Sequence, residues 1–316
     1  MALAAYQPDH RTTMSLPRRP TELVRTLAPL DILTILYTAS SFLVVSLQSI
    51  GADTMRVSSG ELAWLLLAHA LLVVLVFLAA QARNEACAEH CFLAEWYPLV
   101  VLVAVYASVD LVNGPRQAAG LSHDAVIQRL ELATFGRQLA HDWSRSQTQA
   151  AFSWPLSLAY LGFFPLVIAA PAVLWWRGHI IRARQTIFGI SLAFFTCYLV
   201  FLLFPVAGPT YLWGWPTDGA HTALPSRLVR DLIDGGDSWG SAFPSSHVAA
   251  SMAAVLLAFR NWRPLGMVLL PFALGILVGV VYFQVHYAVD AVAGLIIAVF
   301  ATTMAARLIP AHAARA

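Results

Sequence analysis

Two short segments near the C-terminal end of the chain combine histidines with residues that can act on a phosphate ester. They are residues 243–247, Phe-Pro-Ser-Ser-His, and residues 286–290, His-Tyr-Ala-Val-Asp. A carboxylate bound to one imidazole nitrogen fixes the tautomer and makes the other nitrogen a better nucleophile. His286 and Asp290 are four residues apart and would share one face of a helix. Together with His247, this pattern indicates phosphoryl-transfer chemistry.

Ser245 and Ser246 precede an apolar run, so they mark the start of a helix. Hydroxyls and unpaired backbone N–H groups at a helix N-terminus form an anion site, which favours phosphate binding by both serines. Two other interpretations stay open. A serine at this place can simply cap the helix. The two histidines and the aspartate could also bind zinc, although a metal site explains the adjacent serines less well.

The composition places these motifs in a membrane protein. Hydrophobic residues make up 59% of the chain and charged residues 11%, and the mean hydropathy is +0.69. Continuous rather than alternating apolar runs favour helices, because a lipid environment requires every backbone group to be paired internally. We therefore predict an all-α, polytopic bundle of about eight transmembrane helices. The predicted spans are 31–50, 61–80, 92–112, 155–176, 186–204, 247–259, 264–283 and 287–309.

Arginine placement predicts the orientation, because all 19 basic residues are arginine. Short loops that carry arginines alternate along the chain with the long loops 113–152 and 205–246. The positive-inside rule assigns the short arginine-bearing loops, and with them both termini, to the cytoplasm. The apolar run that begins at His247 leads to a cytoplasmic turn near Arg260, and the next run leads back across the membrane to His286. Both histidines are therefore predicted to lie at the extracytoplasmic face. The exclusive use of arginine hints at a GC-rich bacterial genome and hence at a bacterial inner membrane.

The chain reads as one membrane domain, 29–316, after a cytoplasmic tail, 1–28. The first apolar stretch is long and lacks a convincing cleavage site, which favours an uncleaved anchor over a signal peptide. Within the outer loop 113–152, residues 120–143 predict a helix lying in the interface, with Ser122 as its cap. The Pro- and Gly-rich start of the loop 205–246 predicts a folded cap over the site.

Other site classes find little support in the sequence. The cluster at residues 87–91 contains Cys87, His90 and Cys91, but no second pair completes four ligands, so we predict no metal and no cofactor. With Cys197 the cysteines are also too few and too badly placed for a disulfide framework. A net charge of +2 without a basic, aromatic-rich stretch argues against nucleic acid as a partner.

The two motifs resemble the second and third signature motifs of the type 2 phosphatidic acid phosphatase superfamily. The longer segments 204–209, 240–247 and 286–294 are similar to the inositol phosphorylceramide synthase branch. The resemblance covers residues 185–300 and implies a catalytic core over 185–309. It also implies that His286 forms a phosphohistidine, that Asp290 orients it, and that His247 protonates the leaving group and then activates the acceptor.

The chain departs from the phosphatase motifs in its cations. It has no lysine, and Val280 stands where the third motif has an arginine. Arg227 and Arg230 are the predicted substitutes in phosphate binding, with Arg116 and Arg137 behind them. Because headgroup-transferring branches also lack these cations, we predict a lipid phosphotransferase acting on a phospholipid, a ceramide-like lipid or a polyprenyl phosphate. A lipid phosphate phosphatase and a non-catalytic lipid-binding or transport protein are the alternatives.

Overall fold

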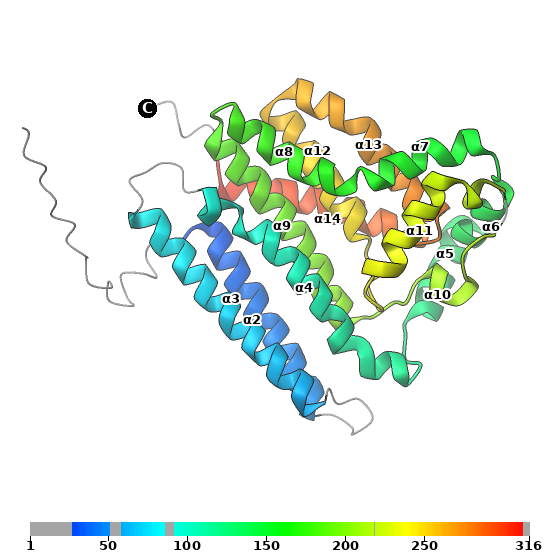
Figure 1. Ribbon diagram of the computed structural model, residues 1–316, viewed down its shortest axis with the longest axis horizontal. Coiled ribbons are helices and arrows are strands. Elements are labelled where there is room, and N and C mark those ends of the chain that lie inside the picture. Colours follow the sequence, from blue (N-terminus) through cyan, green and yellow to red (C-terminus); the bar gives the residue numbers. More distant parts are fainter. Residues whose placement is uncertain (1–26, 51–57, 86–91, 218, 312–316) are drawn as a thin grey trace, which may run out of the picture.

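The computed structural model describes residues 27–50, 58–85, 92–217 and 219–311 of the 316-residue chain. The cluster at 87–91 and nearly all of the tail predicted over 1–28 lie outside the described residues. Within these ranges the chain is helical, apart from turns, loops and an isolated parallel bridge between Val206 and Ser241 (Figure 1). The prediction of an all-α fold is confirmed.

Six helices are long and apolar enough to cross a membrane, and a bent pair would add a seventh. The pair is α7 (Ala150–Leu161) and α8 (Phe163–Trp176), which meet at 49° around Gly162. Pro165 in the first turn of α8 has no N–H, which prevents a continuous helix through this point. The predicted span 247–259 corresponds to the 16-residue α12 (Ser246–Asn261), which is shorter than the six span-like helices. Those six are α2 (Pro29–Ile50), α3 (Ser59–Glu85), α4 (Phe92–Ala118), α9 (Ile180–Leu203), α13 (Arg263–Tyr282) and α14 (Ala288–Leu308).

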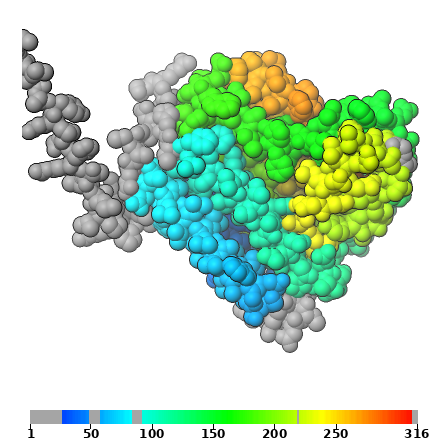
Figure 2. Space-filling model, viewed as in Figure 1, coloured from blue at the N-terminus to red at the C-terminus, as the bar shows by residue number. Residues whose placement is uncertain are grey.

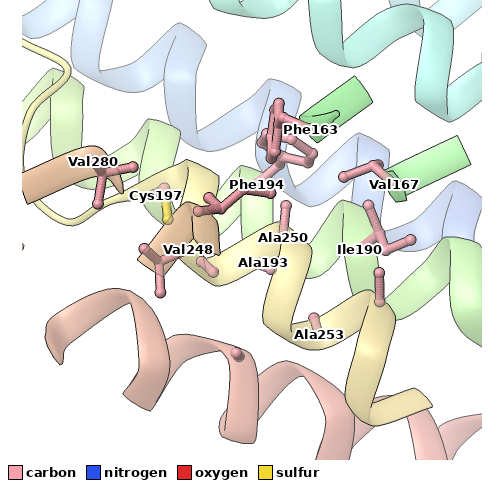
Figure 3. Close-up of a cluster of buried hydrophobic side chains, with 14 of the residues drawn as sticks. Phe163, Val167, Ile190, Ala193, Phe194, Cys197, Val248, Ala250, Ala253 and Val280 are labelled. Carbon is pink, nitrogen blue, oxygen red and sulfur yellow. The ribbon is translucent and has the colours of Figure 1, made fainter. Parts of the chain in front are cut away.

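Helix α12 forms the centre of the bundle and packs against α8, α9, α13 and α14. Its alanines, among them Ala250 and Ala253, are fully buried, and small side chains let neighbouring helices approach closely. Figure 3 shows both alanines among apolar side chains of the surrounding helices, including Phe194 and Phe163. Gly189 of α9 has the same effect, because a Cβ there would lie 2.4 Å from Leu257. A short, small-residue helix thus positions the motif that precedes it.

Helices α2, α3 and α4 lie beside this core, with α2 and α4 against α9 (Figure 1). Many large apolar side chains of α3 are exposed, as expected for a surface that faces lipid. The buried charges of this region pair with one another at one end of the helices. Arg83 binds Asp31 at 2.5 Å, and Arg184 lies 2.8 Å from Glu95.

Short helices cluster at the opposite end, where α12 and α14 begin and α13 ends (Figure 1). In place of one helix over 120–143, the structure has α5 and α6, separated at Gly136, whose φ of 73° is left-handed. The predicted cap Ser122 is also wrong, because His123 precedes the helix and makes no side-chain capping bond. The cluster consists of α5 (Asp124–Phe135), α6 (Leu139–Ser146), α10 (Pro209–Trp213), the 3-10 helix η2 (Gly219–Thr222) and α11 (Leu224–Gly236).

Candidate active site

The structure brings the two predicted histidines together. His247 is the second residue of α12, and His286 lies in the turn between α13 and α14. Nε2 of His286 is 3.5 Å from Nδ1 of His247. His286 is almost fully buried, with 2% of its surface exposed. Residues 39 positions apart in the sequence therefore form one catalytic-type pair.

The backbone carbonyl of Ala242 orients the His286 ring. It lies 2.6 Å from Nδ1, so we assign the proton to Nδ1 and the lone pair to Nε2. The nearest oxygen of Asp290 is 3.7 Å from the same nitrogen, beyond hydrogen-bond distance. The Ala242 carbonyl, and not the expected Asp290 carboxylate, thus accepts the hydrogen bond from Nδ1 of His286. This assignment leaves Nε2, the nitrogen facing His247, with a free electron pair.

Asp290 instead holds the start of α14. Its carboxylate accepts the Tyr287 N–H at 2.7 Å, and its backbone carbonyl accepts the Ser245 N–H at 3.0 Å. The four-residue spacing does not place His286 and Asp290 on one helical face, because the helix begins only at Ala288. Asp290 therefore connects the turn bearing His286 to the helix start bearing His247.

His247 packs against aromatic rings and makes one side-chain hydrogen bond besides its contact with His286. Its Nε2 is 3.2 Å from the Tyr160 hydroxyl, and its ring centroid is 4.5 Å from that of Phe163. With the tyrosine O–H donating to Nε2, Nδ1 carries the proton and points toward His286. The Tyr160 hydroxyl can also accept a proton from Nε2, so the same contact accommodates an imidazolium at His247.

The serines lie at the start of α12, as predicted. Ser245 is the N-cap, and its side chain accepts the Val248 N–H at 3.4 Å. Ser246 is the first helical residue and is 6% exposed. The capping interpretation is thus confirmed for Ser245, whose backbone N–H is also used by Asp290. Gly294 of α14 permits this contact, since a Cβ there would lie 2.6 Å from the Ser245 carbonyl oxygen.

Burial lowers the pKa of His286 from 6.5 to about 4. The Ala242 carbonyl and the negative charge of Asp237 oppose this effect without cancelling it. Removing an imidazolium from water is costly, so the neutral form is favoured. His286 is therefore neutral near pH 7, as a nucleophile must be.

Two acids of α5 that the sequence did not single out as site residues hold this arrangement. Asp124 accepts the N–H groups of Ala207 and Gly208 at 2.8 and 2.9 Å, and the Tyr287 hydroxyl at 2.9 Å. Both acids, Asp124 and Glu131, are buried. No sequence pattern pointed to these hydrogen bonds, because the partners of Asp124 lie more than 80 residues away along the chain.

Glu131 binds the first turn of α14 directly. Its carboxylate accepts the N–H groups of Ala288 and Val289 at 3.2 and 3.0 Å, and that of Leu139 at 3.2 Å. Burial raises the pKa of Glu131, while these backbone donors lower it. Carboxylates stabilise helix N-termini, so Glu131 fixes α14 immediately after the His286 turn.

The predicted phosphate-binding arginines lie on α11. Arg227 is exposed, and Arg230 donates to the Pro216 carbonyl at 2.9 Å with its guanidinium 5.4 Å from the Trp215 ring centre. Neither makes a recorded contact with the two histidines. Arg116, a second-choice substitute, donates to Asn113 and the Leu202 carbonyl, and Arg137 is exposed.

Arg145 of α6 contacts the turn that carries His286, which the sequence did not indicate. It donates to the Gln284 side chain at 2.6 Å and to the Trp213 carbonyl at 3.4 Å. Gln284 has a positive φ of 57° and lies two residues before His286. Arg145 thus links the end of α10 at Trp213 to the turn that carries His286.

The comparison with protein families identifies the fold to which this site belongs. A model described as the PAP2 superfamily matches residues 128–304, more than half of the chain. The chain belongs to the PAP2 superfamily. No curated protein and no solved structure matches it. The match includes both histidines, most of α5, and all of α6 and α11, and it does not identify the inositol phosphorylceramide synthase branch. Membership and the span-like helices support a function of the lipid phosphatase or phosphotransferase type.

The acidic and imidazole groups of the site do not converge as a metal-binding set. Among the described residues, no three His, Cys, Asp or Glu side chains are placed to hold one ion. Asp290 uses its carboxylate on the Tyr287 N–H, and His286 uses Nδ1 on a carbonyl. The geometry of this PAP2 member therefore fits histidine chemistry better than the zinc alternative.

Proposed function

We propose that this protein transfers a phosphate-containing headgroup between lipids, or from a lipid to a polyol, through a phosphohistidine. The observation that carries the proposal is the approach of His286 Nε2 to His247 Nδ1 at 3.5 Å. A nucleophile and a proton donor side by side are what a two-step substitution at phosphorus requires. No metal or cofactor takes part.

In the first step, Nε2 of His286 attacks phosphorus and the bond from phosphorus to the lipid alcohol oxygen breaks. His247 enters this step as an imidazolium with a proton on each ring nitrogen, donates its Nδ1 proton to that departing oxygen and becomes neutral. In the second step, Nδ1 of His247 takes the proton of an acceptor hydroxyl, whose oxygen attacks phosphorus and displaces His286. The Ala242 carbonyl holds the His286 ring throughout, and Asp290 and Glu131 position the two helix starts.

The acceptor decides between transfer and hydrolysis. Val280, which replaces the phosphatase arginine, is fully buried, and its carbonyl accepts the His286 N–H at 3.0 Å. This position therefore contacts the His286 backbone but supplies no cation. Together with the resemblance to the inositol phosphorylceramide synthase branch, this favours transfer. Hydrolysis of phosphatidic acid or of a polyprenyl phosphate by water is the alternative outcome. Arg227 and Arg230 remain proposed contributors to phosphate binding.

We further propose that the site faces the extracytoplasmic side of a bacterial inner membrane. The helix ends opposite the site carry the arginines of the short loops, which the positive-inside rule places in the cytoplasm. Arg182 there binds the Asn261 carbonyl, and Arg177 lies 4.2 Å from the ring centre of Trp262.

The test is to trap the phosphoenzyme. Membranes with the native chain or His286→Ala are supplied with candidate donor and acceptor lipids, and lipids and protein are analysed by mass spectrometry. We expect an acid-labile adduct on His286 and a new headgroup-bearing lipid with the native chain alone, also in the presence of a chelator. A dephosphorylated lipid would establish hydrolysis. The same adduct in His286→Ala, or identical lipid profiles throughout, would contradict the proposal, and identical profiles would favour a non-catalytic lipid-binding or transport role.

A further inference from the structure

A pocket of about 360 Å³ lies between α10 and α11. Figure 2 shows α11 on the visible face of the molecule, at the end away from α2 and α3. Both charged groups that line the pocket are carboxylates, and two aromatic rings face them. Its lining residues are Thr210, Tyr211, Trp215, Ile233, Asp234 and Asp237, and we name it the acidic pocket.

Asp237 connects the acidic pocket to the histidine pair. Its Oδ1 accepts hydrogen bonds from the hydroxyls of Tyr106 at 2.6 Å and Ser241 at 3.2 Å. Ser241 directly precedes Ala242, whose carbonyl holds His286. The negative charge of Asp237 also acts on His286, raising the pKa of the imidazole against the effect of burial. Asp237 thus links the lining of the acidic pocket, through Ser241 and Ala242, to the His286 ring.

Asp234 and Trp215 form the outer wall of the pocket. The indole Nε1 donates to Asp234 Oδ1 at 2.9 Å, which fixes both side chains. Arg230 lies over the Trp215 ring at 5.4 Å and donates to Pro216, so it supports this wall without lining the pocket.

The lining of the pocket determines what it can bind. Two carboxylates repel the phosphoryl oxygens of a substrate, so the phosphate itself is not expected there. Carboxylates combined with tryptophan and tyrosine rings attract an ammonium group, through charge and through the ring faces. An inositol headgroup carries no positive charge and gains nothing from this lining.

We propose that the acidic pocket binds the ammonium group of a donor lipid whose phosphate is attacked by His286. The donor class is then an aminoalkyl phosphate diester, with a primary or a quaternary ammonium two carbons from the phosphate oxygen. This inference rests on the proposed function, because it places the reacting phosphate at the histidines. It also replaces inositol with a cationic headgroup as the transferred group.

The test compares donors that differ only in the headgroup. Reconstituted full-length protein receives phosphatidylethanolamine, phosphatidylcholine, phosphatidylglycerol and phosphatidylinositol with identical acyl chains, and diacylglycerol release is measured. We expect kcat/KM to be at least tenfold higher for an ammonium donor. The arms with ethanolamine and choline distinguish a primary from a quaternary ammonium. In Asp234→Asn, which keeps an acceptor for Trp215, the ratio of cationic to neutral donors should fall roughly tenfold, mainly through KM.

Asp231→Asn is the matched control, since Asp231 is exposed on the same helix and does not line the pocket. It should leave the ratio unchanged. Neutral donors that react as fast as cationic ones in the native protein, or an unchanged ratio in Asp234→Asn, would overturn the inference while leaving the proposed function intact.

A binding measurement separates the two proposals if no donor reacts. Calorimetric titration of the native protein and of Asp234→Asn uses phosphocholine and phosphoethanolamine, with glycerol 3-phosphate as the uncharged-headgroup comparison. Tighter binding of an ammonium compound than of glycerol 3-phosphate, lost in Asp234→Asn, supports the acidic pocket even without turnover. Equal affinities for all three compounds would contradict it.

Discussion

The two ends of the bundle treat buried charge in different ways. At the end of α2, α3 and α4 away from the site, buried carboxylates meet arginines, as in Arg83 with Asp31 and Arg184 with Glu95. At the site end, the buried carboxylates Asp124 and Glu131 accept backbone N–H groups. Ion pairs neutralise charge and clamp helices together. Carboxylates that accept backbone N–H groups instead fix the path of the chain, and a site that depends on precise side-chain geometry needs such support.

Among the substitutions that test the proposed role of the site end, removal of the His247 side chain should have the largest effect on the reaction rate. His247→Ala should slow phosphoenzyme formation from a lipid donor by about 10²–10⁴-fold, because a general acid contributes on that order. An aryl phosphodiester, whose leaving group needs no proton, should react at nearly the native rate. Stopped-flow release of p-nitrophenol from the aryl ester and diacylglycerol release from the lipid measure the two rates. An equal loss with both donors would assign His247 another role.

Glu131→Gln and Asp31→Asn compare the two kinds of buried carboxylate directly. Both should lower the thermal unfolding temperature, because each leaves buried partners without their carboxylate. Only Glu131→Gln should also reduce turnover per folded molecule, by roughly tenfold, since its carboxylate holds the α14 start next to His286. Turnover is normalised to the folded fraction measured by size-exclusion chromatography. A similar loss of turnover in Asp31→Asn would remove the distinction.

Lowering the pH from 7 to 5 should reduce the stability of the fold but not the rate of phosphoenzyme formation. This change should be smaller than the effects of the substitutions above. Because the pKa of His286 is lowered to about 4, the imidazole stays neutral at pH 5, and the burst of phosphoenzyme formation should be unchanged between pH 7 and 5. The unfolded state protonates this histidine near pH 6.5 and the folded state only near 4. Stability should therefore decrease as pH falls through this window. Rapid-quench bursts and thermal unfolding at each pH measure both. A burst that halves near pH 6.5 would show an ordinary, solvated histidine.

Much of the fold could be predicted from the sequence because membrane helices leave a simple signal. Long apolar runs gave the spans, and the helix-start pattern Pro-Ser-Ser gave the beginning of α12 with Ser245 as its cap. The same rule was less accurate where a run contained a break. Residues 155–176 formed the predicted fourth span, yet the chain bends by 49° at Gly162 before Pro165. Composition records that a segment is apolar but not whether it is straight.

The pairing of the two histidines was predictable from the sequence, and the residues that hold them in place were not. His247, His286 and Asp290 could be found because they lie in two short motifs. Ala242 could not, since its contribution is a backbone carbonyl that any residue supplies. Asp124, Glu131 and Asp237 are acids in outer segments, and only folding shows which of them are buried and which backbone groups they bind.

The sequence by itself determined the medium, the helical class and the identity of the histidine pair, because each depends on residue type at short range. The tertiary structure decided how the pair is used. It placed a backbone carbonyl at Nδ1 of His286, placed the Asp290 carboxylate at the start of α14, and formed a pocket lined by Asp234 and Asp237. These outcomes depend on hydrogen bonds and contacts between segments far apart in the chain, where burial and distance rather than composition set the energy.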